Sequence, residues 1–197
     1  MSQIEQLDHL LESYDGMLCT GQVVDAGIPK SVFYQFVRLR GLEQVAHGIY
    51  LSKNTWMGAM YLLHLRCPQA IFSHETALFL HDLTDREPLA YSITVKTGYN
   101  PTRLKDEGLQ VYTIKSELHT VGLTVMQTPF GHDVPAYNRE RTICDVIRSR
   151  SHIEIQTFQE SLKTYARQKD KNLRVLMDYA KLFRVEKILR RYLEVLL

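Results

Sequence analysis

The chain is poor in the features that mark several classes of protein. Its three cysteines, Cys19, Cys67 and Cys144, are odd in number and far apart, and no pair has CxxC spacing. Neither a disulfide framework nor a zinc knuckle is therefore predicted, and reduced, buried thiols in a cytoplasmic protein are expected. No apolar run approaches the ~20 residues of a membrane span. The composition is that of an ordinary globular protein.

Catalytic and cofactor motifs are also missing. The sequence contains no GxSxG, P-loop, GxGxxG or HExxH pattern. His74-Glu75 and His81-Asp82 resemble metal-ligand spacing, but the first pair fits a helix start capped by Ser73 better. We therefore predict no metal site, no cofactor and no enzymatic activity.

The charged segment Arg139–Thr142, followed by Asp145, contains two of the carboxylates that a nuclease site would use. Glu140 and Asp145 would need a further carboxylate on a strand, so we interpret the segment as a helix cap with salt bridges. No motif in the sequence supports an enzyme that reverses or blocks a modification made by a partner protein. It remains a third alternative, which variants of Glu75, Glu140 or Asp145 would test.

Charge is unevenly distributed along the chain. Three basic residues stand against six acidic ones in Met1–Tyr50, and ten against six in Ser151–Leu197. Because phosphate neutralisation supplies most non-specific affinity for DNA, the basic C-terminal helices could add backbone contacts to a DNA-binding head. A solvated helix face explains the same charge equally well.

The N-terminal third predicts a winged helix-turn-helix. Gly27 ends one short helix, Pro29 suits the start of the next, and Gly41 ends that one. Thr20 is the expected N-cap of the short helix. His47-Gly48 is a tight-turn pair between two strands. The expected elements are helices over Ser2–Tyr14, Gly21–Ala26 and Lys30–Arg40, and strands over Glu43–Ala46 and Ile49–Ser52.

The helix over Lys30–Arg40 is the expected DNA-reading element. Its apolar residues fall on one side, and polar residues that can contact base edges or phosphates fall on the other. The predicted DNA-binding residues are Lys30, Ser31, Tyr34, Gln35 and Arg38, with Arg40 at the basic end and His47 in the hairpin turn. A trihelical bundle with a hairpin also serves as a protein-docking module, which stays open as an alternative.

The remainder predicts a mixed domain, so the expected fold class is α+β. We expect residues 1–53 to form the winged domain and residues 54–197 a second domain, with a small sheet at about 70–137 and helices over 139–197. Expected helices are Trp56–Leu65, His74–Leu83, Arg139–Arg150, Glu154–Gln168, Leu173–Phe183 and Val185–Leu196. Expected strands are Ile71–Ser73, Tyr91–Thr97, Leu109–Lys115 and Leu123–Thr128, with Gly98–Gly108 a loop and Gly131–Asn138 a turn or edge strand.

Four segments resemble the AbiEi-type antitoxin family. GIPKSVFYQFVRLRGLEQVAHGIYL is similar to its N-terminal winged domain, and IFSHETALFLHDL, which starts at Ile71, is similar to its "isheTAl..hgL" segment. YSITVKTG resembles the strand that follows, and YNRERTICDVIRSR, which ends at Arg150, resembles its "ERT..D..R" helix. The matches occur in the family's order and cover most of the chain up to about Arg150.

The resemblance implies an antitoxin of a bacterial type IV toxin–antitoxin pair. Its functional partner would be a nucleotidyltransferase-like toxin, with which it forms no stable complex. It would also repress its own promoter by binding double-stranded DNA at inverted repeats, as a monomer or a weak dimer that pairs on DNA. In this family the C-terminal domain is linked to antitoxin activity. The alternative is a winged-helix interaction module that neutralises a toxin by direct contact.

Overall fold

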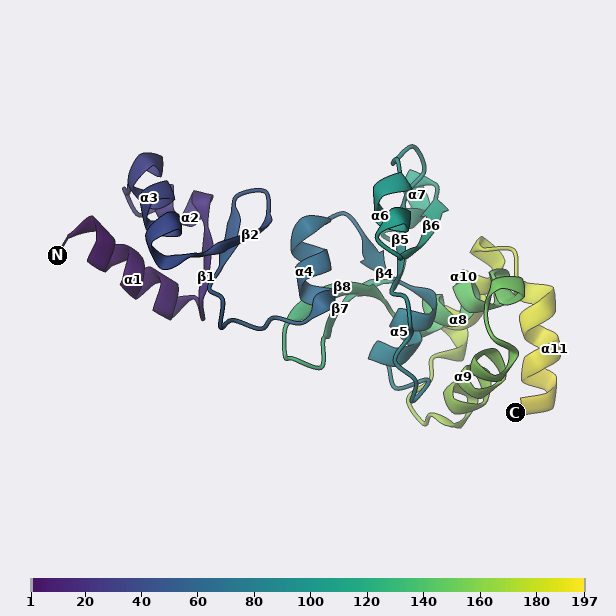
Figure 1. Ribbon diagram of the computed structural model, residues 1–197. Helices are drawn as coiled ribbons and strands as arrows, with labels where there is room; N and C mark the ends of the chain where they lie inside the picture. The colour runs from purple at the N-terminus through teal and green to yellow at the C-terminus, as the bar shows by residue number, and fades with distance from the viewer. Residues whose placement is uncertain (1, 197) are drawn as a thin grey trace. The chain divides into compact units, whose positions relative to one another are not determined.

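The computed structural model describes residues 2–196, so residues 1 and 197, at the outer limits of the expected domains, lie outside it. The fold is α+β and divides into two compact units, Met1–Pro68 and Gln69–Leu197 (Figure 1). The expected boundary at residue 53 differs from this division. Helix α4 (Ala59–Arg66) packs against strand β2 (Glu43–Ala46) and therefore belongs to the first unit.

The first unit combines four helices with a small antiparallel sheet. Before α4 its elements are α1 (Gln3–Ser13), β1 (Met17–Cys19), α2 (Thr20–Asp25), α3 (Lys30–Arg40), β2, and β3 (Ile49–Leu51). The strand order is β1-β3-β2. The sequence analysis missed β1, because three residues are too few to show a strand's alternation.

The core of the first unit forms where the helices meet the sheet. Helix α3 has the predicted bounds, and its Phe33 and Phe36 are fully buried. Phe33 meets Tyr50 of β3 edge-on, with ring centroids 5.2 Å apart. The other buried members are Leu7, Leu18, Val23, Ile28 and Leu42. One side of α3 is therefore fixed by packing, and the opposite side is left for solvent or a ligand.

The second unit is a five-stranded mixed sheet with helices around it. Its strands are β4 (Ile71–Phe72), β5 (Ser92–Lys96), β6 (Gln110–Ile114), β7 (Leu123–Gln127) and β8 (Asp133–Tyr137), in the order β6-β5-β4-β8-β7. Its helices are α5 (His74–Leu80), α6 (Thr102–Asp106), α7 (Ser116–His119), α8 (Arg139–Arg148), α9 (Ile155–Arg167), α10 (Leu173–Leu182) and α11 (Glu186–Leu196), with a 3-10 turn at Arg150–His152. Strand β4 pairs with β5 antiparallel and with β8 parallel, whereas β5–β6 is parallel and β7–β8 antiparallel.

Two expectations for this unit were wrong. Strand β8 is an inner strand between β4 and β7 rather than a turn or edge strand. Pro135 made an edge position the natural prediction, but the two-residue β4 meets β8 only at Ala136, so few ladder bonds are required on that side. The expected loop Gly98–Gly108 contains helix α6. Among the described residues, no helix combines the length and hydropathy that crossing a bilayer requires.

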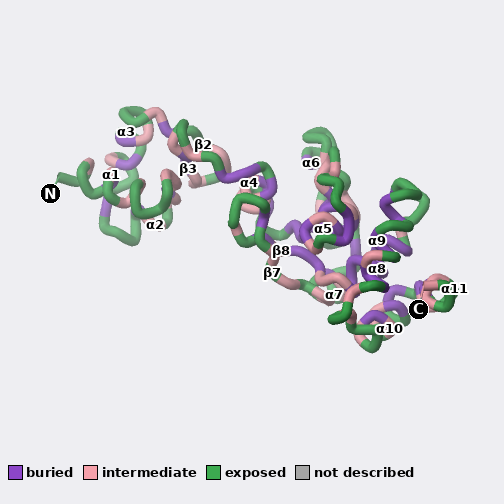
Figure 2. The backbone as a smooth tube through the Cα atoms, turned by 90° about the horizontal axis from the view of Figure 1, so that it is seen from below, coloured by how far each residue is buried: buried purple, intermediate pink, exposed green. Residues whose placement is uncertain are grey.

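Helix α8 is the centre of the second unit. Eight of its residues, Glu140 to Ile147, are buried. Figure 2 colours the backbone by burial. It contacts α5, α9, α10 and α11. The Asn138 side chain caps the helix by accepting from the Arg141 amide. The predicted helix cap is therefore confirmed. The predicted salt bridges are also present, since Arg139 pairs with Asp170 and Arg141 with Asp145.

A buried ion pair lies at the middle of α8. The Arg141 and Asp145 side chains have no exposed surface, and Arg141 Nε donates to Asp145 Oδ2 at 2.8 Å. Arg141 Nη1 donates to the carbonyls of Leu118 and Val121, in and after α7. Its guanidinium also lies between two rings, 4.2 Å from the centroid of Tyr137 and 3.8 Å from that of Phe183. One side chain thus joins α8 to α7, to β8 and to the end of α10.

Replacing Arg141 with methionine is expected to cost up to about 3–5 kcal/mol of unfolding free energy, because the buried Asp145 loses its fully buried partner and keeps only the partly exposed Arg148, whose Nη2 lies 3.2 Å from Oδ1. Urea unfolding followed by circular dichroism measures the loss. The double change Arg141→Met with Asp145→Leu should recover part of it. Arg103→Met breaks the exposed Arg103–Glu107 pair of the same i,i+4 spacing and should cost under ~1 kcal/mol. Equal losses at Arg141 and Arg103 would contradict this role.

Candidate nucleic-acid interface

Five predicted DNA-binding residues share the free face of α3. All are exposed, and they lie opposite the buried Phe33 and Phe36; they are Lys30, Ser31, Tyr34, Gln35 and Arg38. Within residues 2–196, neither Lys30 nor Arg38 forms an ion pair. The face therefore presents two uncompensated cations, an amide and two hydroxyls, a set that can contact both phosphates and base edges.

The turn before α3 fixes how that face is presented. Gly27 adopts φ +78°, a left-handed conformation that a side chain would strain, and Ile28 is buried in the core. Pro29 precedes the helix and supplies no side-chain cap. The first amides of α3 are consequently available to an anion at the positive end of the helix dipole.

Arg40 takes a structural position instead of the predicted contact position. Its guanidinium makes a two-pronged pair with Asp8 of α1, with Nε–Oδ1 at 2.9 Å and Nη2–Oδ2 at 2.6 Å. The Asp8 carboxylate raises the pKa of Arg40. The pair joins the end of α3 to α1, and the Asp8 carboxylate neutralises the charge of Arg40. We therefore omit Arg40 from the candidate interface.

The hairpin between β2 and β3 is anchored at its turn. His47 is exposed, and Gly48 follows it at φ +71°. The Gly48 carbonyl accepts from the Thr20 amide at 2.7 Å and from the Thr20 hydroxyl at 3.2 Å. The prediction that Thr20 is the N-cap of α2 is wrong, because Cys19 holds that position and the Thr20 hydroxyl bonds to the hairpin. Sequence reasoning missed this anchor, since no local pattern links residues 28 positions apart.

Tyr34 belongs partly to the interface and partly to the core. It is 41% exposed, and its ring meets that of Tyr50 at 6.4 Å between centroids. Burial, with a smaller contribution from Tyr34, raises the pKa of Tyr50. Tyr34 therefore has restricted freedom, which lowers the entropy that a contact through its hydroxyl would lose.

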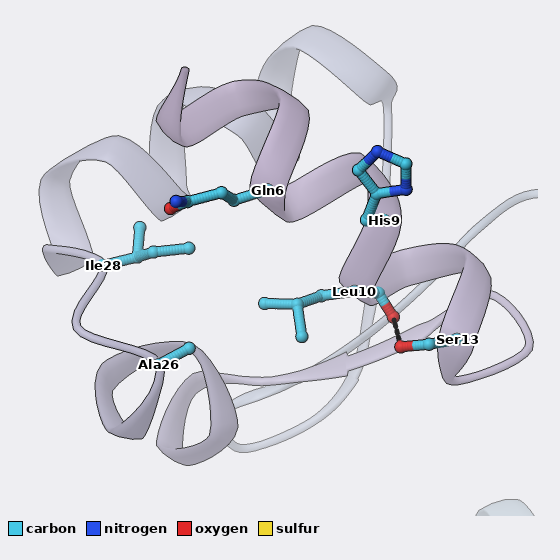
Figure 3. A pocket seen from close by; sticks show the side chains of 6 residues that line it. All are labelled: Gln6, His9, Leu10, Ser13, Ala26 and Ile28. Atoms are coloured by element: carbon cyan, nitrogen blue, oxygen red, sulfur yellow. Dashed lines mark hydrogen bonds between the residues drawn. The ribbon is translucent and has the colours of Figure 1, made fainter. Parts of the chain in front are cut away.

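An open groove of about 480 Å³ lies between α1 and the turn before α3 (Figure 3). Gln6, His9, Leu10 and Ser13 of α1 face Ala26 and Ile28 of the turn before α3. The Ser13 hydroxyl donates to the Leu10 carbonyl.

The two histidines weighed as metal ligands are engaged separately. His74 is fully buried, lies 3.0 Å from the Ser73 hydroxyl and 3.1 Å from that of Ser149, and stacks on Tyr112 at 3.5 Å between centroids. His81 Nε2 lies 2.7 Å from the Tyr137 carbonyl. Ser73 holds the predicted N-cap position of α5, but its hydroxyl makes no capping bond and contacts His74 and Thr94 instead. Within residues 2–196 no group of three His, Cys, Asp or Glu side chains could hold a metal ion.

Comparison with known proteins identifies a fold relative. No protein-family model matches the chain, and no curated protein does. The crystal structure of the RV2827C protein from Mycobacterium tuberculosis is similar to the chain, with a TM-score of 0.59 and 14% identity. The similarity covers 95% of this chain and 78% of that one. At this identity the likeness concerns the fold alone, and it extends over both units.

The buried His74 should make the protein sensitive to mild acid. Burial, with the nearby Arg148 and Arg141 charges, holds the pKa of His74 well below its ordinary value of 6.5. The unfolded chain therefore binds a proton more readily, and unfolding free energy should fall as pH drops below 6.5. This group contributes at most ~1.4 kcal/mol per pH unit. Urea unfolding between pH 7.5 and 5.5 measures the slope.

His74→Asn should flatten that slope, because asparagine tolerates the residue's φ of +48° and does not titrate. The exposed His9 provides the control, and His9→Asn should leave the slope unchanged. The same slope in His74→Asn and the unsubstituted protein would refute the role given to His74.

Proposed function

We propose that the first unit is a winged helix-turn-helix that binds double-stranded DNA with α3 in the major groove. The exposed polar face of α3 carries this proposal. It stands on a helix fixed by Phe33 and Phe36 and presented by a short turn that contains Gly27. Gln35 suits adenine, and Arg38 suits guanine or a phosphate. The hairpin turn at His47 serves as the wing.

The charge of this unit favours a model in which α3 selects the DNA site and other parts of the chain add phosphate contacts. Asp8 neutralises Arg40, which leaves Lys30 and Arg38 as the uncompensated cations of α3. Two cations can contribute to the sequence specificity of DNA binding, but they neutralise too few phosphates to give a high affinity by themselves. Exposed basic residues on the C-terminal helices, among them Arg167 and Arg174, are available for further phosphate contacts.

We further propose that the chain is a cytoplasmic antitoxin that represses its own operon. The order of its four AbiEi-like segments supports this assignment. Two copies would occupy an inverted repeat, since a two-fold arrangement of reading helices matches a palindromic site. The partner would be a nucleotidyltransferase-like toxin encoded beside it.

Arg38→Ala and Gln35→Ala are each expected to weaken binding to a duplex from the chain's own promoter by about 1–3 kcal/mol, the usual size of a base contact. Both side chains are exposed, so the thermal midpoint should not change. Fluorescence anisotropy at fixed salt measures the affinity. Arg103→Ala and Gln110→Ala, exposed residues of the second unit, are matched controls and should bind normally. Unchanged affinity in both α3 variants would exclude α3 as the reading helix.

The proposed antitoxin activity should not depend on the reading face. Co-expression with the toxin from the neighbouring reading frame should restore growth equally for the unsubstituted chain and for the Gln35→Ala, Arg38→Ala double variant. Growth curves measure the rescue, and pull-down of the tagged chain tests for a complex. Loss of rescue in the double variant would contradict this division, and a stoichiometric toxin complex would favour direct neutralisation.

A further inference from the structure

A groove with an apolar floor lies between α9 and α11 of the second unit. These helices pack together (Figure 1), and Phe158 of α9 meets Tyr192 of α11 edge-on at 5.4 Å between centroids. The cavity measures about 630 Å³. Its apolar lining is Phe158, Leu162, Ile188, Tyr192, Val195 and Leu196.

Helix α11 carries more apolar surface than the fold covers. Leu189 is fully buried in the core, whereas Val195 is 84% exposed. Ile188, Tyr192 and Val195 recur at i, i+4 and i+7, the spacing of one helix stripe. An exposed stripe beside a groove is the pattern used to seat a partner helix.

The charged residues of the groove are all positive. Arg150, Lys163 and Arg191 line it, with no Asp or Glu among the lining residues. Within residues 2–196, Lys163 and Arg191 form no ion pair, whereas the neighbouring Arg190 is held by Glu186 at 2.9 Å. The two free cations flank an apolar floor, so an occupant with acidic edges and an apolar stripe is complementary to the groove.

We propose that this groove docks an amphipathic helix with acidic flanks from another protein. A second copy of the chain is a poor occupant, because a symmetric α11 contact would bring the Arg191 charges of two copies together. A DNA backbone would neutralise the same cations but leave the exposed Val195 and the aromatic floor unused. Docking here goes beyond the proposed repressor and antitoxin function and does not depend on it.

The test uses labelled synthetic peptides of about 18 residues, roughly five helical turns. One has leucine at i, i+3, i+4 and i+7 with glutamate flanks, the second has lysine flanks, and the third scrambles the acidic composition. Anisotropy with the full chain should show the acidic helix binding at least ~10-fold more tightly than the basic one, since like charges across an interface are costly. The scrambled peptide should bind as weakly as the basic one.

Charge reversal supplies the decisive variants. Lys163→Glu combined with Arg191→Glu should invert the preference toward the basic peptide. Arg174→Glu combined with Lys187→Glu makes the same change in net charge at exposed positions that do not line the groove, and should retain the acidic preference. Val195→Asp should weaken binding of the acidic peptide at least 10-fold without changing the thermal midpoint.

Several results would overturn the proposal. These are equal binding of the scrambled peptide, inversion by the control pair, or no binding of the acidic peptide at all. Sedimentation showing a dimer that Val195→Asp dissolves would assign the groove to a second copy. Loss of duplex binding in the groove variant, with no peptide preference, would assign it to phosphate. Arg38→Ala should weaken duplex binding but leave peptide binding intact. Failure of the peptide-docking proposal can therefore be told apart from failure of the proposed DNA binding.

Discussion

The second unit depends on one buried ion pair, Arg141 with Asp145. Because the arginine is fully desolvated, its donors need partners: Nη1 donates to the carbonyls of Leu118 and Val121 and Nε to the Asp145 carboxylate one turn along α8, whereas Nη2 makes no hydrogen bond within residues 2–196. The rings of Tyr137 and Phe183 cover the guanidinium on both faces. Gly122 lets the backbone pass close to Arg141, because a Cβ added at Gly122 would lie 2.7 Å from the Cβ of Arg141. Helices α9 to α11 are thereby arranged around a fixed α8, and the groove between α9 and α11 follows from that arrangement.

In the first unit, contacts on one side of helix α3 hold it in place and leave its other side exposed. Phe33 and Phe36 bury one side of α3, and the Arg40–Asp8 pair ties its end to α1. The bond from Thr20 to the Gly48 carbonyl holds the hairpin at the start of α2. These contacts use none of the polar side chains on the outer face. A rigid helix with an uncommitted face is what reading DNA requires, and this is why the proposal rests on α3 and not on total charge.

The sequence allowed local elements to be predicted better than long-range ones. Helix α3 and strand β2 have the predicted bounds, because Gly41 and the apolar spacing of Phe33 and Phe36 are local signals. The outer face of α3 followed from the same periodicity. The role of Arg40 could not be foreseen, since it depends on Asp8, which lies 32 residues away in the chain. The inner place of β8 was missed for the same reason: it is decided by the distant β4, not by its own residues.

The measurement that tests the DNA-reading role of α3 most sharply is selection of binding sites from a pool of random duplexes. The unsubstituted protein and a Gln35→Lys variant would be selected in parallel, at one salt concentration. Gln35 is exposed, so the exchange leaves the fold intact, and lysine prefers guanine where glutamine prefers adenine. If α3 reads the major groove, both proteins enrich an inverted repeat, and one adenine in each half-site becomes guanine with the variant. Identical enriched sites for the two proteins, or no enrichment with either, would contradict it.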